Sequence, residues 1–387
     1  MAYTAPKVWY STTLTGSYTE LTGIEAISVT RGRQRFTDAF AGSQCTIELI
    51  PANSYATALA IGQFIDIRAT NSGSSPALFT GRITDVQRNY GIPYNASNTI
   101  AAPADRIVIT ATGATGVIGN QSLDGDVSLT AGTDAIFQAA SRAVAEASVD
   151  NPQGYASLGA TPSGVNVSAK TYSAGSAVME IMNELLRTAQ WVMDDADLAR
   201  TQLNTYDFGV RFFPTSATGS TITFSDAGTA SSYKYNEIEY LSSIQQTFST
   251  VVVRPSGLAT QYATSGTLLN TYSFDTVDQT TTQALGLANY VLTVANQSTP
   301  APFAIRTNTA VDSTTDVLAR LETYPVGTNV QVIFRGTTVY ATVQGWNFNF
   351  YPAYANTTAY MSASLGTPFT LDSTSFGVLD TNRLGYP

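Results

Sequence analysis

The chain has 387 residues, of which 43% are hydrophobic and only 12% are charged, and its formal net charge is −9. Its length allows two or three domains with ordinary cores. The excess of acidic residues argues against a protein that grips nucleic acid by neutralising phosphates, and the complete absence of histidine removes the most common general base and metal ligand.

The N-terminal residues do not show the basic and then apolar profile of a signal peptide. No apolar run approaches the roughly 18–20 residues that a membrane helix needs. We therefore expect a soluble protein that is synthesised in the cytoplasm and has no membrane segment. The single cysteine, Cys45, lies in an alternating stretch and has no partner for an internal disulfide. We expect it to be a small buried hydrophobic residue and not a reactive thiol.

Residues 1–112 are predicted to form a first tube-like β-barrel. Apolar and polar residues alternate at 27–31, 44–49, 65–68 and 106–112. Short strands of this period at short intervals are typical of a barrel or a sandwich. The composition agrees, because Thr, Tyr, Val and Ile favour strands and tyrosine alone numbers 21.

Residues 113–232 are predicted to form an α+β insert domain with two helices, because the hydrophobic period changes here. Apolar residues follow one helical stripe at 134–147 and a second, clearer one at 178–189. Ser173 or Ser176 can cap the second helix. Short strands are predicted around 191–193, 209–213 and 221–224.

Residues 233–387 are predicted to form a second tube-like β-barrel with a helical insert near 275–300. Strand character is strongest at 250–254, and the apolar stripe of the helix runs from about 280 to 292. At 346–350, Trp and Phe residues alternate with asparagines, so that the aromatic side chains should share one face of a strand.

A pattern from the first barrel returns in the second. Residues 61–68 and 78–86 form a glycine-led alternating strand, a polar turn and a second alternating strand. Residues 326–334 and 338–346 repeat this order. We therefore predict one small barrel that is built twice. The expected fold class is mainly β with α+β inserts, in which two tube-like β-barrel domains are joined by a helix-containing insert domain.

Few side chains in the sequence indicate a catalytic, metal-binding or phosphate-binding site. Asp194, Asp195 and Asp197 form the densest acidic cluster, but they lack the frame of an EF-hand, so a solvated turn is favoured over a calcium site. The glycines of 113–119 lack the Lys-Ser/Thr of a phosphate loop, and a plain loop is predicted. No carboxylate pair stands out for glycoside hydrolysis. We predict no catalytic, cofactor-binding or metal-binding residues and no cofactor.

The most basic stretch is Arg31-Gly32-Arg33-Gln34-Arg35. Arginine suits bidentate pairing across interfaces, so one hypothesis is a salt-bridged contact with a neighbouring subunit. The alternative is a solvated strand end, and the residues alone do not separate the two.

Two parts of the chain, one near each end, carry short motifs that resemble those of a known family. At the start these motifs are residues 27–33, 40–42, 46–49 and 78–85, with Gly62 before a strand, and at the end they are residues 371–386. They resemble the minor tail proteins of long-tailed bacteriophages, and in particular the baseplate hub proteins that close the tail tube. The order of barrel, helical insert and second barrel with its own insert is also similar to that family.

The resemblance implies a structural virion protein without enzymatic activity. Hub proteins form homotrimers in which two barrels per chain make a ring of six, which adapts a hexameric tail tube to threefold tip components and lines the DNA exit channel. The implied partners are a distal tail or tail tube protein above and tail fibre or spike proteins below, with a tape-measure protein as a further candidate. The implied location is the tail tip of the virion, and no sequence-specific binding of nucleic acid is implied.

Two other functions stay open at this point. Aromatic residues make up 11% of the chain and could stack on sugars, as in a carbohydrate-binding tail adhesin or receptor-binding module. However, Tyr and Trp are equally expected in barrels and interfaces. A glycoside hydrolase is the third hypothesis.

Overall fold

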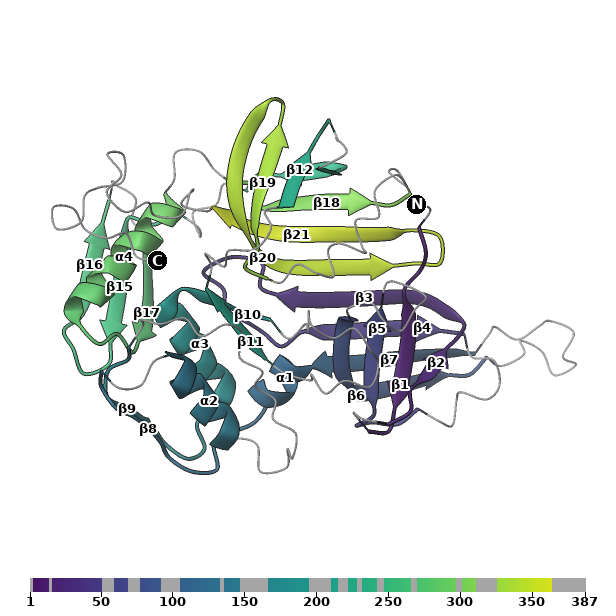
Figure 1. Ribbon diagram of the computed structural model, residues 1–387, viewed down its shortest axis with the longest axis horizontal. Coiled ribbons are helices and arrows are strands. Elements are labelled where there is room, and N and C mark those ends of the chain that lie inside the picture. The colour runs from purple at the N-terminus through teal and green to yellow at the C-terminus, as the bar shows by residue number, and fades with distance from the viewer. Residues whose placement is uncertain are drawn as a thin grey trace, which may run out of the picture.

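The computed structural model describes residues 3–13, 16–50, 59–68, 77–91, 105–132, 136–146, 166–194, 210–214, 222–227, 232–241, 247–265, 270–296, 301–310 and 326–363. Fourteen strands join one large sheet, and the smaller sheets and most of the helical residues lie toward the left of this sheet in Figure 1. The predicted fold class, mainly β with α+β inserts, is confirmed.

The first repeat consists of strands that pair in one continuous series, whose two ends are joined by the chain and not by a ladder. β1 pairs with β5, β5 with β6, β6 with β7, β7 with β4, and β4 with β3, all antiparallel. β2 pairs with β1 and leads after two residues into β3, so the order returns to its start. The strands are β1 (Lys7–Ser11), β2 (Thr19–Leu21), β3 (Ile24–Gly32), β4 (Gln44–Leu49), β5 (Phe64–Arg68), β6 (Ala77–Asn89) and β7 (Arg106–Gly113).

Gly23 lets β2 and β3 act as one bent strand. Its φ of +77° belongs to the left-handed region, and a Cβ atom there would lie 2.2 Å from the carbonyl oxygen of Ile50. The Ile50 N–H donates to the Gly23 carbonyl at 2.8 Å, which extends the ladder between β3 and β4. Only glycine combines this conformation with so close an approach.

The strands of the second repeat pair in the same order, but one strand runs in the opposite direction. β19 pairs with β20, β20 with β21, β21 with β18, and β18 with β14, all antiparallel. β13 leads after two residues into β14, and β12 lies parallel between β13 and β19, whereas β1 is antiparallel to its neighbours. The strands are β12 (Ile222–Ser225), β13 (Tyr233–Lys234), β14 (Glu237–Glu239), β18 (Ala304–Asn308), β19 (Asn329–Phe334), β20 (Thr337–Phe350) and β21 (Ala355–Ala363).

The pattern that repeats in the sequence is also a repeated hydrogen-bond frame. The Gly62 N–H donates to Ile83 in β6, and the Gly327 N–H donates to Val343 in β20, each at 2.8 Å. Both glycines have positive φ, +88° and +94°. A β-bulge follows directly after Ile83 and after Val343. The glycine-led pattern is therefore repeated in the pairing of the strands, with the same hydrogen bond and the same bulge in both copies.

The two repeats share an edge. Residues 345–350 of β20 pair with β21 on one side and with residues 27–32 of β3 on the other. This antiparallel junction makes the strands of both repeats parts of one sheet.

The first insert follows β7 and carries the two predicted helices. Residues 136–146 of the first predicted stripe form α2, and the stripe at 178–189 forms α3. The predicted serine caps of α3 are wrong, because the N-cap is Ala177, which makes no side-chain capping bond. The elements are α1 (Ala114–Gly119), β8 (Val127–Leu129), α2 (Ile136–Glu146), β9 (Lys170–Tyr172), α3 (Val178–Ala189), β10 (Trp191–Asp194) and β11 (Arg211–Pro214).

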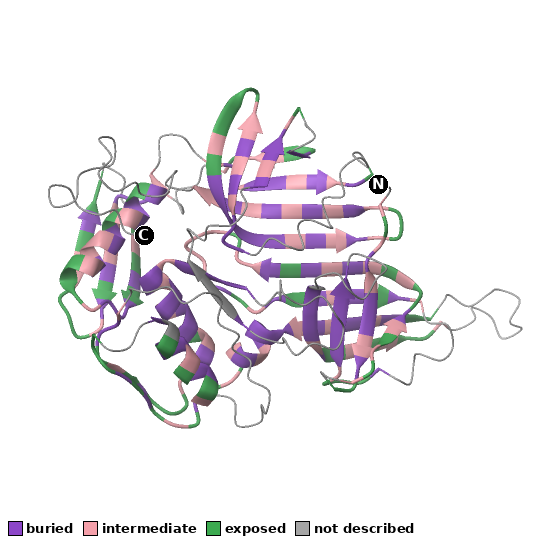
Figure 2. Cartoon of the chain, in the orientation of Figure 1, coloured by how far each residue is buried: buried purple, intermediate pink, exposed green. Residues whose placement is uncertain are grey.

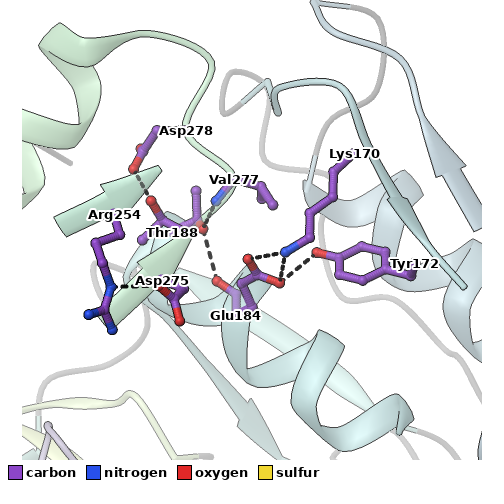
Figure 3. Close-up of polar contacts among 9 residues, drawn as sticks. Lys170, Tyr172, Glu184, Thr188, Arg254, Asp275, Val277 and Asp278 are labelled. Carbon is purple, nitrogen blue, oxygen red and sulfur yellow. Dashed lines mark hydrogen bonds and ion pairs between the residues drawn. The ribbon is translucent and has the colours of Figure 1, made fainter. Parts of the chain in front are cut away.

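The second insert has a core of its own. The strand predicted at 250–254 belongs to a separate sheet, against which the helix predicted at about 280–292 packs. A capping box of Thr280 and Gln283 begins this helix. Thr188 of α3 accepts a hydrogen bond from the Val277 N–H at 3.0 Å, which ties the two inserts together (Figure 3). The elements are β15 (Thr250–Pro255), β16 (Gln261–Thr264), β17 (Thr271–Thr276) and α4 (Thr281–Ala295).

Candidate functional site: a polar sheet face across both repeats

Strand alternation places the polar side chains of eight neighbouring strands on one side of the large sheet. Directly paired residues share a face. The register carries one row from Asn347 through Thr30 and Gln44, and in the other direction through Thr358 and Arg306. We call this surface the polar sheet face. Its polar members are Glu237, Glu239, Arg306, Asn308, Asn356, Thr358, Tyr360, Asn347, Asn349, Ser28, Thr30, Gln44, Thr46, Glu48, Arg106, Thr110, Thr112, Asp85, Gln87 and Asn89.

The centre of the polar sheet face is almost free of charge. The strands β21, β20 and β3 contribute amides and hydroxyls to it, which appear as half-buried or exposed bands between buried ones in Figure 2. Farther out, Arg306 binds Glu237 at 2.5 Å and Glu239 at 2.7 Å. Amides and hydroxyls hold water without a fixed charge, so this surface offers a polyanion few sites to bind.

The opposite side of β20 is a row of aromatic rings. Trp346, Phe348 and Phe350 are each at most 1% exposed. Neighbouring rings stack with centroids 5.7 and 5.9 Å apart. The predicted division of this strand into an aromatic and an asparagine face is confirmed. The large buried area of the rings holds the polar sheet face in place.

A buried ion pair anchors the junction of the repeats to the first insert. Arg31 Nε donates to Asp194 at 3.1 Å, and Arg31 Nη2 donates to the second oxygen of the same carboxylate. The two side chains are 1% and 0% exposed. Asp194 also accepts a hydrogen bond from the Val326 N–H at 3.0 Å, directly before the glycine that enters β19. One carboxylate therefore holds β10, β3 and the second repeat together.

Both hypotheses for the arginine stretch are wrong for Arg31. Arg31 pairs inside its own chain, and Arg33 donates to Gln344 at 2.8 Å and to the Asp38 carbonyl at 3.1 Å. Asp194 likewise does not lie in a solvated turn, because it is buried against Arg31. The acidic residues that follow it lie outside the described residues. These partners are 163 and 311 positions apart, so no local pattern indicated them.

The remaining sequence candidates form no reactive centre in the part of the chain that the structure describes. No group of three or more His, Cys, Asp or Glu side chains comes together there in a way that could hold a metal ion. Cys45 is buried as predicted, and burial raises the pKa of its thiol. The loop predicted at 113–119 is wrong, because these residues end β7 and form the short helix α1. Every helix among the described residues is too short or too polar to cross a bilayer.

The similarities of this chain to known proteins are similarities of structure. No family model matches the chain, and no curated protein matches it. The tail protein from Neisseria meningitidis MC58 is similar over 93% of this chain and 97% of that one, with a TM-score of 0.60 and 12% identity. The 43 kDa tail protein of prophage MuSo2 from Shewanella oneidensis is similar over 92% and 98%, with a TM-score of 0.59 and 12% identity.

Prophage tail protein gp18 from Listeria monocytogenes EGD-e is similar over 93% of this chain and 95% of that one, with a TM-score of 0.50 and 10% identity. All three similarities span nearly the whole of both chains. The chain therefore has the fold of phage tail proteins, as the motifs in its sequence predicted.

Proposed function

We propose that the chain is a structural protein of a phage virion that forms a homotrimeric hub at the tail tip. In this role it adapts the hexameric tail tube to threefold tip components and lines the channel through which DNA leaves. The observation that carries the proposal is the polar sheet face, which runs from one repeat into the other through the pairing of β20 with β3.

The two equivalent repeats support the adaptor role. Three copies of a chain with two equivalent units present six similar units around one axis, which matches a hexameric partner on one side and a threefold partner on the other. The division into 1–112, 113–232 and 233–387 stays part of this proposal, with β12 contributing to the second repeat.

The charge distribution supports a channel lining. The chain carries a net charge of −9, and the centre of the polar sheet face presents amides and hydroxyls. Arg306 on this face is already paired with Glu237 and Glu239. A DNA duplex that touches the face would release few counterions, so it would pass without adhering.

The proposed partners follow from the same role. They are a distal tail or tail tube protein above, tail fibre or spike proteins below and a tape-measure protein as a further candidate. The protein would be synthesised in the host cytoplasm and act in the virion without enzymatic activity and without sequence-specific binding of nucleic acid.

Cryo-electron microscopy of intact tails tests the proposal. We expect three copies of this chain, each placing both repeats around the tail axis with the polar sheet face toward the channel. A different number of copies, or a polar sheet face directed away from the axis, would contradict the hub. An affinity tag inserted at the exposed turn around Gly257 would identify the chain in the map.

A carbohydrate-binding adhesin is the alternative, and exposed tyrosines favour it. Tyr262 is 61% exposed and Tyr340 is 48% exposed. Their rings could stack on sugars. Glycan-array binding that disappears in the Tyr262→Ala or Tyr340→Ala variant would support this function over the hub.

A further inference from the structure

The junction of β20 with β3 provides a template for joining one copy of the chain to another. In the first repeat, residues 85–89 of β6 are equivalent to residues 345–349 of β20, because both stretches follow the bulge in the same frame. In the second repeat, β14 is equivalent to β3, because the two strands occupy the same position in the pairing order of their repeats. Each chain thus contains both halves of a second junction.

These two halves do not meet within the chain. Residues 85–89 pair only with β7, and residues 237–239 pair only with β18, among the strands of the described residues. An open strand edge is a ready template for pairing with another chain. One edge of each kind is therefore available to a second copy.

The equivalence also determines a register. Within the chain, Asn349 lies opposite Ser28. Counting along the ladders from the two bulges makes Asn89 the equivalent of Asn349 and Glu239 the equivalent of Ser28. Asn89 of one copy should therefore lie opposite Glu239 of the next.

Exposed tyrosines mark both open edges. Phe350, which β3 covers, is 1% exposed, whereas the equivalent Tyr90 is 64% exposed. Val29 is 0% exposed, whereas the equivalent Tyr240 is 41% exposed. Aromatic residues are enriched in the cores of protein–protein interfaces, so these edges fit a partner that covers them.

We infer that β6 of one copy pairs antiparallel with β14 of a second copy of this chain, in the register that β20 and β3 have within one chain. The inference rests on the proposed function, which supplies the number of copies, and it adds the strands and residues that make the contact. The pairing continues the polar sheet face from copy to copy, because Gln87 and Asn89 lie on that face of β6 and Glu239 lies on it in β14.

Disulfide trapping of the full-length chain tests the register. In the variant Asn89→Cys/Glu239→Cys, the two introduced thiols belong to directly opposite residues, whose Cβ atoms lie about 4.5–5.5 Å apart in antiparallel pairs. We expect oxidation to give linked species of two and three chains on a non-reducing gel. The buried Cys45 does not compete. The matched control, Gln87→Cys/Glu239→Cys, is two residues out of register and should link at least about tenfold less.

The outcomes separate this inference from the hub itself. Trimers in native mass spectrometry without a link between positions 89 and 239 would overturn the inference and leave the hub intact. Linked ladders that continue beyond three chains would support the strand pairing and contradict the trimer. A chain that stays monomeric and unlinked at high concentration would overturn the inference, while the symmetry of the intact tail would still decide the hub.

A pair of tyrosine variants provides a second test. Tyr90→Asp should weaken self-association at least about tenfold, because it places a charge in the covered centre of the contact. Tyr262→Asp is the control, since Tyr262 has a similar exposure of 61% but lies on β16, away from both edges. Equal association of the two variants, with unchanged thermal unfolding, would contradict the proposed contact.

Discussion

The two repeats share a backbone frame but differ in the side chains that this frame carries. After its bulge, β20 presents a row of buried aromatic rings, whereas the equivalent positions are Val86 and Arg88 in β6 and Tyr90 directly after it. The strand β3 covers β20, while no described strand covers the same edge of β6. The hydrogen-bond frame therefore defines the repeat. The side chains at equivalent positions differ according to whether another strand pairs with that edge.

The largest effect should come from breaking the aromatic row. Phe348→Ala removes a fully buried ring between two stacked neighbours, so we expect it to lower the free energy of unfolding by about 3–5 kcal/mol. The equivalent change in the first repeat, Arg88→Ala, removes a half-buried side chain that donates to the Leu59 carbonyl at 2.7 Å, and it should cost only about 1–2 kcal/mol. Urea denaturation measures the free energy of unfolding of both variants. Similar losses would show that the two strands contribute equally to stability.

The anchor of the junction should be nearly as sensitive. Arg31→Ala leaves Asp194 buried without its cation, and we expect a loss of about 3–5 kcal/mol in the free energy of unfolding. Arg254→Ala is the control, because the side chains of Arg254 and Asp275 are 51% and 67% exposed and such pairs contribute about 0–1 kcal/mol.

A double variant sharpens this prediction. Arg31→Met with Asp194→Leu removes both charges together, so part of the lost stability should return, although the buried Val326 N–H loses its acceptor. If the double variant is as unstable as Arg31→Ala, the ion pair is needed for its geometry and not only for charge balance.

The glycines that enter β5 and β19 should respond differently to alanine, although both have positive φ. Gly62→Ala meets no atom within 4 Å, so only the backbone strain of about 1–2 kcal/mol remains. Gly327→Ala places a Cβ atom 2.4 Å from Val192 Cγ2, which should add about 1–3 kcal/mol. Thermal unfolding of Gly327→Ala with and without Val192→Ala checks this, and a second change that brings no relief would exclude the clash as the cause.

The two attachments of α3 should differ in their response to pH. Asn183 joins α3 to Phe40 of the first repeat through two neutral hydrogen bonds of 2.7 and 3.1 Å. On the other side, Asp278 lies directly after Val277, which contacts α3 (Figure 3). The Asp278 carboxylate accepts a hydrogen bond from the Thr276 hydroxyl at 2.6 Å. Burial raises the pKa of Asp278 to about 6, although the Thr276 hydroxyl opposes the shift.

The effect of Asp278 should appear as a slope of the unfolding free energy against pH. The unfolded chain loses the Asp278 proton near pH 4, while the folded chain keeps it until about pH 6, so stability should fall as the pH rises between these values. The total change should be about 1–3 kcal/mol. Asp278→Asn should flatten this part of the curve and stabilise the protein at pH 7–8, which urea denaturation across pH measures. An unchanged slope would show that Asp278 is already ionised in the fold.

Local patterns of residues were enough to locate many of the elements and the repeated frame. Period-two alternation indicated the strands at 27–31, 44–49 and 106–112, and the stripe at 178–189 indicated α3. The glycine-led pattern indicated the two copies of the frame. These features were readable because each depends on residues that are close together in the chain, where the period of the backbone decides which side chains share a face.

The way in which these elements meet depends on contacts between distant parts of the chain. The partners of Arg31 and Arg33, the reversed direction of β12 and the pairing of β20 with β3 all join residues far apart in the chain. The same holds for the polar sheet face, which exists only once eight strands are in register. The alternation of apolar and polar residues predicts on which face of a strand a side chain lies. It does not predict the neighbouring strand, because that depends on which strand edges the whole fold leaves open.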